Sequence, residues 1–532
     1  MYARTAALLC AVALAGFLLR SSRGRAARRC NVVLVSIDSL RADHLGCYGY
    51  PAGSGAPTSP HLDRLASEGV LFEHAQSTTS WTMPSHHALF SGRPDLAHGA
   101  VSDENGPTLQ RVDLAQVLAD AGYATAGFFS GPYLDPRYGF GGGFELYENL
   151  GPEDELSSHQ ASSAKRVSDR AIGWLDDHAR AEPPFFLFLH YFDVHYDYSP
   201  PEEGYARRFW PGGRRPRIGG DGFFENAEIH AGMEADDLAG VVACYDGEIL
   251  WTDEQVGRVL DRLEALHLAD DTLVVVVSDH GDEFFEHGAK GHRQNLFEPT
   301  LHVALIARLP GRLPAGRRVP QRVSIVDVAP TVLDLCGALE KADFHAADAK
   351  ELHPGDLDHG MWGRSVLPLV DGRERADRDC LGFLANRWQD PDHAVDTWAL
   401  WTGSTKVVVS KRYDWIRDEA GAKVGLKTIE RTGRVFDLAR DPGELHDLAA
   451  SRDPAAAAAI ARFDAVFAES SALSRVTAAL EAGPPPAPLT EAQRLALEQL
   501  GYTAGSTPPP RLPPGTRLKQ RLPPMPQFPR RE

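Results

Sequence analysis

Short apolar segments alternate with segments of helical periodicity along the first two thirds of the chain. Several of the short segments are apolar at nearly every position, which is typical of strands buried on both faces of a parallel sheet. The predicted strands are Asn31–Ile37, Ala124–Phe129, 185–190, 273–278 and 303–307. The predicted helices are Pro60–Glu68, 114–121, 163–179, 235–266 and 325–336. This alternation predicts a doubly wound α/β fold with right-handed crossovers.

The pattern changes from about residue 374. Short alternating segments predict antiparallel strands, and an alanine-rich segment predicts a helix over 454–467. The predicted strands of this part are 398–402, 406–410, 412–416 and 434–439. Beyond residue 482 the chain is rich in proline, which favours disorder. We therefore expect a catalytic domain over 30–373, an α+β subdomain over 374–482 and a disordered tail over 483–532.

The first 29 residues predict a signal peptide or an N-terminal anchor. Residues 6–19 form an apolar run of 14 residues, which suits a signal peptide better than a full membrane span. Five arginines follow the run, only one precedes it, and no clear A-x-A cleavage site is found. An uncleaved anchor therefore stays open beside cleavage. Either way, we expect an exported protein that is periplasmic, secreted or anchored to a membrane.

Composition narrows the classes of partner. The chain has 532 residues, 43% of them hydrophobic, and a formal net charge of −18 at pH 7. Such a charge argues against a nucleic-acid binder, which would present a basic face. An anionic substrate stays compatible with it, because a bound cation can reverse the local field. The six cysteines form no CxxC pair, so neither a zinc knuckle nor a thioredoxin-like motif is expected.

Polar residues follow two of the predicted strands directly. Asp38 follows Asn31–Ile37, and Asp279 and His280 follow 273–278. Ligands bind beyond the carboxyl ends of the strands in an open α/β sheet. Alone, Asp38 fits a helix cap as well as it fits a metal ligand. Alone, Asp279 and His280 also fit an ordinary polar turn. Together with the hydroxyl of Thr82, they predict a divalent-metal site made by Asp38, Thr82, Asp279 and His280.

Several other hydroxyl and imidazole groups are candidates for the chemistry. Ser80 and Ser85 compete with Thr82 as nucleophile. His195 follows the strand 185–190, and His292 lies in another loop. Either imidazole can hold a substrate oxyanion or protonate a leaving group. Each of them alone also fits an ordinary hydrogen-bonded histidine, so their assignment depends on the whole set.

Seven sequence blocks in order resemble the sulfatase family, within the alkaline phosphatase superfamily. They run from about residue 30 to 450 and read SIDSLRADHLGCYGY, TSPHLDRLASEGVLFEHA, STTSWTMPSHHALFSG, YFDVHYDYSPP, CYDGEILWTDEQVGRVLD, VVVVSDHGDEFFEHG and VFDLARDPGELHDLA. The resemblance implies a large mixed, mostly parallel sheet between helices. It also implies a small C-terminal antiparallel sheet and one divalent-metal site.

The chain departs from the sulfatase pattern at the nucleophile. Sulfatases carry Cys-x-Pro-x-Arg, whose Cys, or Ser in some members, is oxidised to formylglycine, and here Thr82 and His86 occupy the Cys and Arg positions. Asp38-Ser39 replaces a pair of acids, and His292 aligns with a lysine of many sulfatases. The ligand set resembles that of threonine-using relatives, the nucleotide pyrophosphatase/phosphodiesterases and the lipoteichoic-acid-synthase-like transferases.

These observations predict a metal-dependent ester hydrolase or transferase that cleaves phosphoric mono- or diesters through Thr82. His195 would hold the non-bridging oxygens, and His292 or His86 would protonate the leaving oxygen. The expected cofactor is one divalent ion, Mn²⁺, Zn²⁺, Mg²⁺ or Ca²⁺. A second metal would need Asp193 or Asp197 together with His195. The expected partner is an anionic ester substrate and not a nucleic acid, with membrane anchoring through the N-terminus left open.

Two alternatives remain at this point. One is a sulfuric ester hydrolase that acts without formylglycine, which family resemblance favours and Thr82 opposes. The other is a non-catalytic protein that binds anionic glycans or lipids, which the missing second carboxylate and the lost arginine suggest.

Overall fold

The computed structural model describes residues 29–51, 55–101, 113–151, 163–178, 183–224, 226–341, 363–386, 393–417 and 423–480. The predicted N-terminal segment, except Arg29, and the predicted tail lie outside the described residues. Among the helices of the described ranges, none has the length and hydropathy needed to cross a membrane.

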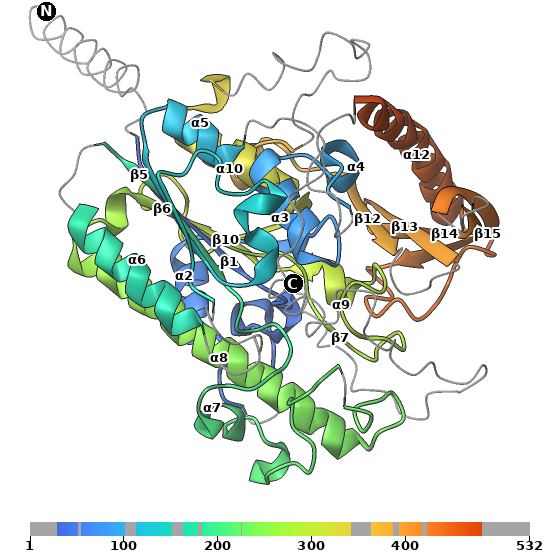
Figure 1. Ribbon diagram of the computed structural model, residues 1–532, viewed down its shortest axis with the longest axis horizontal. Helices are drawn as coiled ribbons and strands as arrows, with labels where there is room; N and C mark the ends of the chain where they lie inside the picture. Colours follow the sequence, from blue (N-terminus) through green and yellow to red (C-terminus); the bar gives the residue numbers. More distant parts are fainter. Residues whose placement is uncertain are drawn as a thin grey trace, which may run out of the picture.

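A large mixed sheet forms the centre of the molecule (Figure 1). Its strands lie in the order β11-β2-β10-β6-β1-β5-β3-β4, with β9 beside β2. The strands are β1 (Asn31–Ile37), β2 (Val70–Gln76), β3 (Ala124–Phe129), β4 (Leu146–Asn149), β5 (Phe185–Tyr191), β6 (Thr272–Ser278), β9 (His302–Val303), β10 (Leu305–Arg308) and β11 (Arg317–Ser324). Most pairs are parallel, while β10 runs antiparallel to both neighbours. The predicted α/β class is confirmed.

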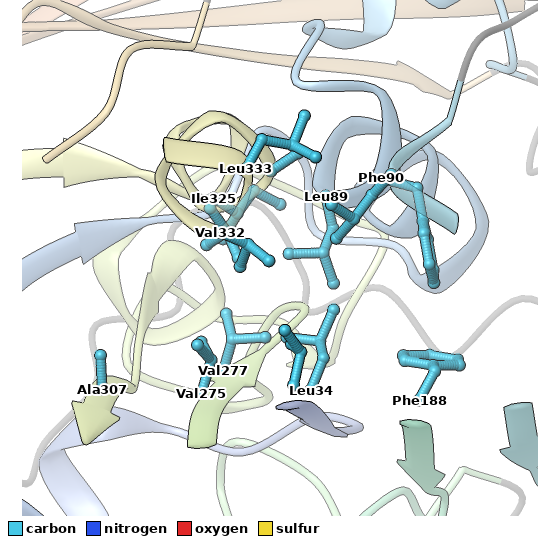
Figure 2. Packing of buried hydrophobic residues seen from close by; sticks show 14 of the residues in the cluster. Leu34, Leu89, Phe90, Phe188, Val275, Val277, Ala307, Ile325, Val332 and Leu333 are labelled. Carbon is cyan, nitrogen blue, oxygen red and sulfur yellow. The ribbon is translucent and has the colours of Figure 1, made fainter. Parts of the chain in front are cut away.

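Helices cover both faces of this sheet (Figure 1). One face lies under α3 (Thr82–Ser91), α5 (Leu114–Asp120) and α10 (Val328–Leu335), and the other under α2 (Pro60–Glu68), α6 (Ala164–His178) and α8 (Ala235–Ala265). Side chains alternate between the faces along each strand. Leu34, Phe188 and Val277 therefore meet Leu89 of α3 and Val332 of α10 (Figure 2). Burial of each such side chain stabilises the folded protein by about 1.5–3 kcal/mol relative to an exposed side chain.

A second, antiparallel sheet follows in the chain. Its strands, in sheet order, are β12 (Cys380–Asn386), β13 (His393–Thr402), β14 (Thr405–Arg417) and β15 (Lys423–Asp437). The helix α12 (Pro454–Leu480) packs on it through Phe463, which lies in one cluster with Phe383 and Trp398. The separate small sheet that the resemblance implied is thus present.

Two details of the prediction for this region were wrong. The segments 406–410 and 412–416 belong to one continuous strand, β14, and a register shift after Arg412 interrupts its alternation. The strand β12 was not predicted, because Gly382 breaks its apolar run. Besides short 3-10 helices, the described residues form α4 (Asp95–His98), α7 (Glu203–Arg207), α9 (Glu298–Leu301), α11 (Leu367–Val370), β7 (Glu283–Phe284) and β8 (Lys290–Gly291).

Candidate active site

The carboxyl ends of β1 and β6 bring the two predicted aspartates together. Ile37 pairs with Ser278 in the parallel register, so Asp38 and Asp279 leave neighbouring strands at the same edge. The backbone N–H of Ser39 donates to Asp279 Oδ1 over 3.1 Å, which ties the two strand-end turns to each other. Ser39 adopts a φ of 56°, a left-handed conformation that is uncommon for serine and allows this tight turn.

The nucleophile candidate Thr82 is the first residue of α3. This helix covers the face of the large sheet on which α5 and α10 also lie. Its Oγ1 lies 3.4 Å from Asp38 Oδ2 and 3.2 Å from His280 Nε2. The competing hydroxyls point elsewhere: Ser80 Oγ donates to the carbonyl oxygen of Asn295 and Ser85 Oγ to that of Thr82. Of the three hydroxyls, only that of Thr82 contacts the acidic cluster.

The geometry of this cluster fits a divalent cation. Asp38, Asp279 and His280 each offer one ligand atom, and these atoms lie within 4.8 Å of one another. Two ligands of a cation at about 2.1 Å are themselves about 3.0–3.5 Å apart. His280 Nε2 lies 3.2 Å from Thr82 Oγ1, 3.4 Å from Asp279 Oδ2 and 3.6 Å from Asp38 Oδ1. Asp279 Oδ2 is buried and accepts no hydrogen bond from the described residues.

The electrostatics of the two aspartates also call for a cation. Burial raises the pKa of Asp38 well above its ordinary value, and the nearby Asp282 adds to this. Burial and the charge of Asp38 raise the pKa of Asp279 in the same direction. Among the described residues, no lysine or arginine forms an ion pair with either aspartate. Ionised carboxylates without a positive partner are unfavourable in such a site.

The predicted proton donor His86 lies beneath the nucleophile and is fully buried. Its Nδ1 contacts the carbonyl oxygen of Thr82 at 2.8 Å, and its Nε2 contacts Ser36 Oγ at 2.9 Å. Because a carbonyl only accepts, Nδ1 carries the proton and Nε2 accepts from the serine. Both ring nitrogens are thus engaged within the protein. This arrangement favours a supporting role for His86 over the role of proton donor.

The other two predicted histidines do reach the site. The ring of His292 lies 4.3 Å from that of His280 and 5.0 Å from that of His195, centroid to centroid. His292 Nδ1 contacts Asp282 Oδ1 at 2.6 Å, and Tyr198 donates to Asp282 Oδ2 over 2.7 Å. His195 Nδ1 contacts the carbonyl oxygen of Tyr196 at 2.6 Å.

Two further residues, for which the sequence predicted no role, lie in this site. One is Asp282, the carboxylate partner of His292. The other is His190 at the end of β5, whose Nε2 lies 3.4 Å from Asp38 Oδ2. A polar residue at the carboxyl end of an otherwise apolar strand was the available signal for His190. Asp193, considered for a second metal, instead accepts hydrogen bonds from Ser163 and Trp251.

Comparisons with known proteins agree with the fold and with the resemblance. The family model "Sulfatase" matches residues 30–338, more than half of the chain. Human arylsulfatase A is 25% identical over 480 residues, which cover 79% of this chain and 84% of that protein. The crystal structure of the phosphonate monoester hydrolase of Agrobacterium radiobacter gives a TM-score of 0.62 at 21% identity, over 84% of this chain and 96% of that one.

A further solved structure was determined in complex with its substrate D-glucosamine-2-N,6-O-disulfate. It gives a TM-score of 0.62 at 17% identity and covers 86% of this chain and 100% of that one. At this identity the likeness shows the fold alone. The family match, in contrast, extends over all strands of the large sheet. The chain therefore belongs to the sulfatase family, whose members are metal-binding hydrolases of ester bonds.

Proposed function

We propose that this enzyme cleaves phosphoric mono- or diesters through Thr82, at a divalent cation held by Asp38, Thr82, Asp279 and His280. The observation that carries the proposal is the position of the Thr82 hydroxyl, 3.2 Å from His280 Nε2 and 3.4 Å from Asp38 Oδ2. When bound, such a cation lowers the pKa of a coordinated hydroxyl and stabilises negative charge on the transferring group. The mixed carboxylate and imidazole set suits Mn²⁺, Zn²⁺ or Mg²⁺ at least as well as Ca²⁺.

Thr82 carries the transferred group between two half-reactions. In the first, the hydroxyl of Thr82 has lost its proton to solvent, and a bond forms from Oγ1 to phosphorus while the bond from phosphorus to the leaving oxygen breaks. In the second, water or an alcohol attacks phosphorus in line and releases Thr82. Thr82 is also the first residue of α3, so the positive end of the helix dipole favours negative charge there.

His292 and His195 supply protons and hydrogen bonds to the substrate. Each uses Nδ1 within the protein, on Asp282 and on the Tyr196 carbonyl, so contact with a substrate is made through Nε2. Burial and the charge of Arg293 lower the pKa of His292 to about 3, which keeps it neutral before substrate binds. A bound anionic ester favours the imidazolium form. His292 then protonates the leaving oxygen, and the neutral imidazole takes a proton from the incoming water.

The single hydroxyl of threonine favours phosphorus over sulfur as the centre attacked. A formylglycine hydrate has two hydroxyls, and the second expels sulfate without attack of water on sulfur. Thr82 has one, so a sulfo-threonine would be opened only by direct attack at sulfur. A phospho-threonine is opened by in-line attack at phosphorus, which nearby positive groups assist.

Sulfuric ester hydrolysis is the second candidate. The specific observation in its favour is the likeness to arylsulfatase A along 79% of the chain. The non-catalytic alternative loses support, because the chain belongs to a family of hydrolases. For the cellular location we keep the proposal of export, which depends on the apolar run over residues 6–19.

The test compares turnover of bis-nitrophenyl phosphate, nitrophenyl phosphate and nitrophenyl sulfate by metal-reconstituted protein. Thr82→Ala is the decisive variant, and Ser85→Ala is the matched control on the same helix. Phosphoester turnover that disappears in Thr82→Ala and persists in Ser85→Ala supports the proposal. Full turnover by Thr82→Ala would refute the assignment of the nucleophile, and turnover of the sulfate ester alone would establish the second candidate.

A further inference from the structure

We propose that His190 is a ligand of the same cation, through Nε2, so that the centre contains two imidazoles from two different strands. The proposal deepens the proposed function and rests on its cation site. His190 lies opposite Ser36 of β1 in the parallel register of β5, two residues before Asp38. Because side chains alternate along a strand, Ser36, Asp38 and His190 all face the side covered by α3.

The hydrogen bond of the other ring nitrogen fixes the tautomer of His190. Nδ1 lies 2.7 Å from the carbonyl oxygen of Ser130, which can only accept. In the neutral ring the proton is therefore on Nδ1, and Nε2 presents a lone pair. Nε2 lies 3.4 Å from Asp38 Oδ2, and it has no hydrogen-bond partner among the described residues. His190 is 1% exposed, so bulk water does not compensate this atom.

Two electron-rich atoms that face each other in a buried site need a positive charge between them. A proton would draw the pair into a short hydrogen bond, as in two other buried His–Asp pairs of this protein. His292 and Asp282 are 2.6 Å apart, and His44 and Asp246 are 2.8 Å apart. The separation of 3.4 Å between His190 Nε2 and Asp38 Oδ2 is larger. It matches the distance of about 3.0–3.5 Å between two ligands of one cation.

The neighbouring His86 is a weaker candidate for the same role. Nitrogen or oxygen atoms of His86, His190 and Asp279 also lie within 4.8 Å of one another. However, His86 has both nitrogens in hydrogen bonds, to Thr82 and to Ser36. His190 has only one. We therefore assign His190 as ligand and His86 as the support of α3.

Two imidazoles and two carboxylates change the expected metal preference. Imidazole ligands suit Mn²⁺, Zn²⁺ and other transition metals, whereas Ca²⁺ takes oxygen ligands almost exclusively. The centre should therefore bind Mn²⁺ much more tightly than Ca²⁺, and the difference should shrink when His190 is replaced.

The first measurement is electron spin-echo spectroscopy of the wild-type protein loaded with Mn²⁺, which counts the imidazole nitrogens bound to the metal. Two are expected, from His190 and His280. A count of one would overturn the assignment of His190 and leave the proposed cation site intact. Failure of the wild-type protein to bind Mn²⁺ at all would instead overturn the cation site itself. The wild-type count is informative even if a variant does not fold.

The variant His190→Phe keeps a planar ring and removes both nitrogens. We expect one bound imidazole and an Mn²⁺ affinity at least about tenfold lower by calorimetry, with little change for Ca²⁺. The matched control is His87→Phe, since His87 is equally buried but stacks on Phe140 with ring centroids 4.1 Å apart. An unchanged Mn²⁺ affinity and imidazole count in folded His190→Phe would contradict the proposal.

Discussion

Two clusters of buried acidic residues in this molecule differ in how their negative charge is neutralised. In the first, Asp38 and Asp279 meet at the carboxyl ends of β1 and β6. In the second, Glu298 of α9 and Glu444 meet beside the C-terminal sheet, where Lys406 Nζ lies 3.1 Å from Glu298 Oε1 and 2.7 Å from Glu444 Oε1. Only the second cluster contains its own cation. The chain thus neutralises the acids that join two sheets, and leaves uncompensated the acids that can hold a metal.

The pKa values follow this difference. Burial alone would raise the pKa of Glu298, but Lys406 and Arg322 lower it to about 2. Burial raises the pKa of Glu444 to about 7 despite the same lysine. One ionised glutamate beside one lysine gives a balanced pair at neutral pH. At Asp38 and Asp279, burial and like charge act in the same direction, so an external cation or protons must balance them.

The largest effect is expected from Asp279→Asn in the first cluster. Turnover should fall by about 10³-fold or more, because the cation that stabilises the transferring group loses a ligand. Without metal, the variant should be more stable than the wild type. Its free energy of unfolding should be higher by about 1–4 kcal/mol, because an uncompensated buried acid is removed. Turnover assays, with metal analysis beside them, measure the first effect, and urea unfolding of the metal-free proteins measures the second. Asp253→Asn is the control, because Asp253 accepts hydrogen bonds from the start of α2 and should leave metal content unchanged.

The corresponding change in the second cluster is Lys406→Met. It removes the lysine that Glu298 and Glu444 share, so the free energy of unfolding should fall by about 3–5 kcal/mol. Metal content should stay that of the wild type, because this cluster is not the metal site. The exposed Lys427→Met on β15 is the control and should change stability by less than about 0.5 kcal/mol. A stable Lys406→Met protein would show that the lysine does not hold the two sheets together.

A smaller loss of turnover is expected for Asp282→Asn, which replaces the carboxylate partner of His292. The amide keeps the shape but cannot stabilise a protonated His292, so kcat should fall by about 10–100-fold with the metal retained. The pKa of His292 should fall further. Because the protonated ring donates the proton, the basic limb of the kcat profile should shift to lower pH. Tyr198→Phe removes only one hydrogen bond from Asp282 and should have a milder effect. An unchanged pH profile in Asp282→Asn would argue against His292 as the proton carrier.

The sequence predicted the parts of the site that depend on single strands and their ends. The proximity of Asp38 and Asp279 could be predicted, because each follows an apolar strand and the two strands lie parallel and side by side. His190 was not assigned, since its approach to Asp38 depends on β5 being the other neighbour of β1. That order is a property of the topology and not of any local pattern.

The partnership of Asp282 with His292 was missed for a similar reason. The two residues are brought together by the hairpin of β7 and β8, in which Glu283 pairs with Gly291. Strands of two residues leave no periodicity in the sequence. The separate C-terminal sheet was expected, but its long strands were divided because a register shift after Arg412 changes the alternation.

The two clusters should respond differently to a fall in pH. Protons compete with the metal for Asp38 and Asp279, whose pKa values in the folded protein are raised, so metal affinity should fall by about tenfold per displaced proton per pH unit below those pKa values. Glu298 behaves oppositely: its pKa is lowered from 4.5 to about 2, so its contribution to stability is present above pH 4.5 and is lost only as the pH falls towards 2. On acidification, the stabilisation of the protein by Mn²⁺ should therefore vanish before the stabilisation by Glu298 is lost. Urea unfolding of the wild type with and without Mn²⁺, and of metal-free Glu298→Gln, between pH 7 and 3 measures both, and simultaneous loss of the two effects would mean that the clusters are not independent.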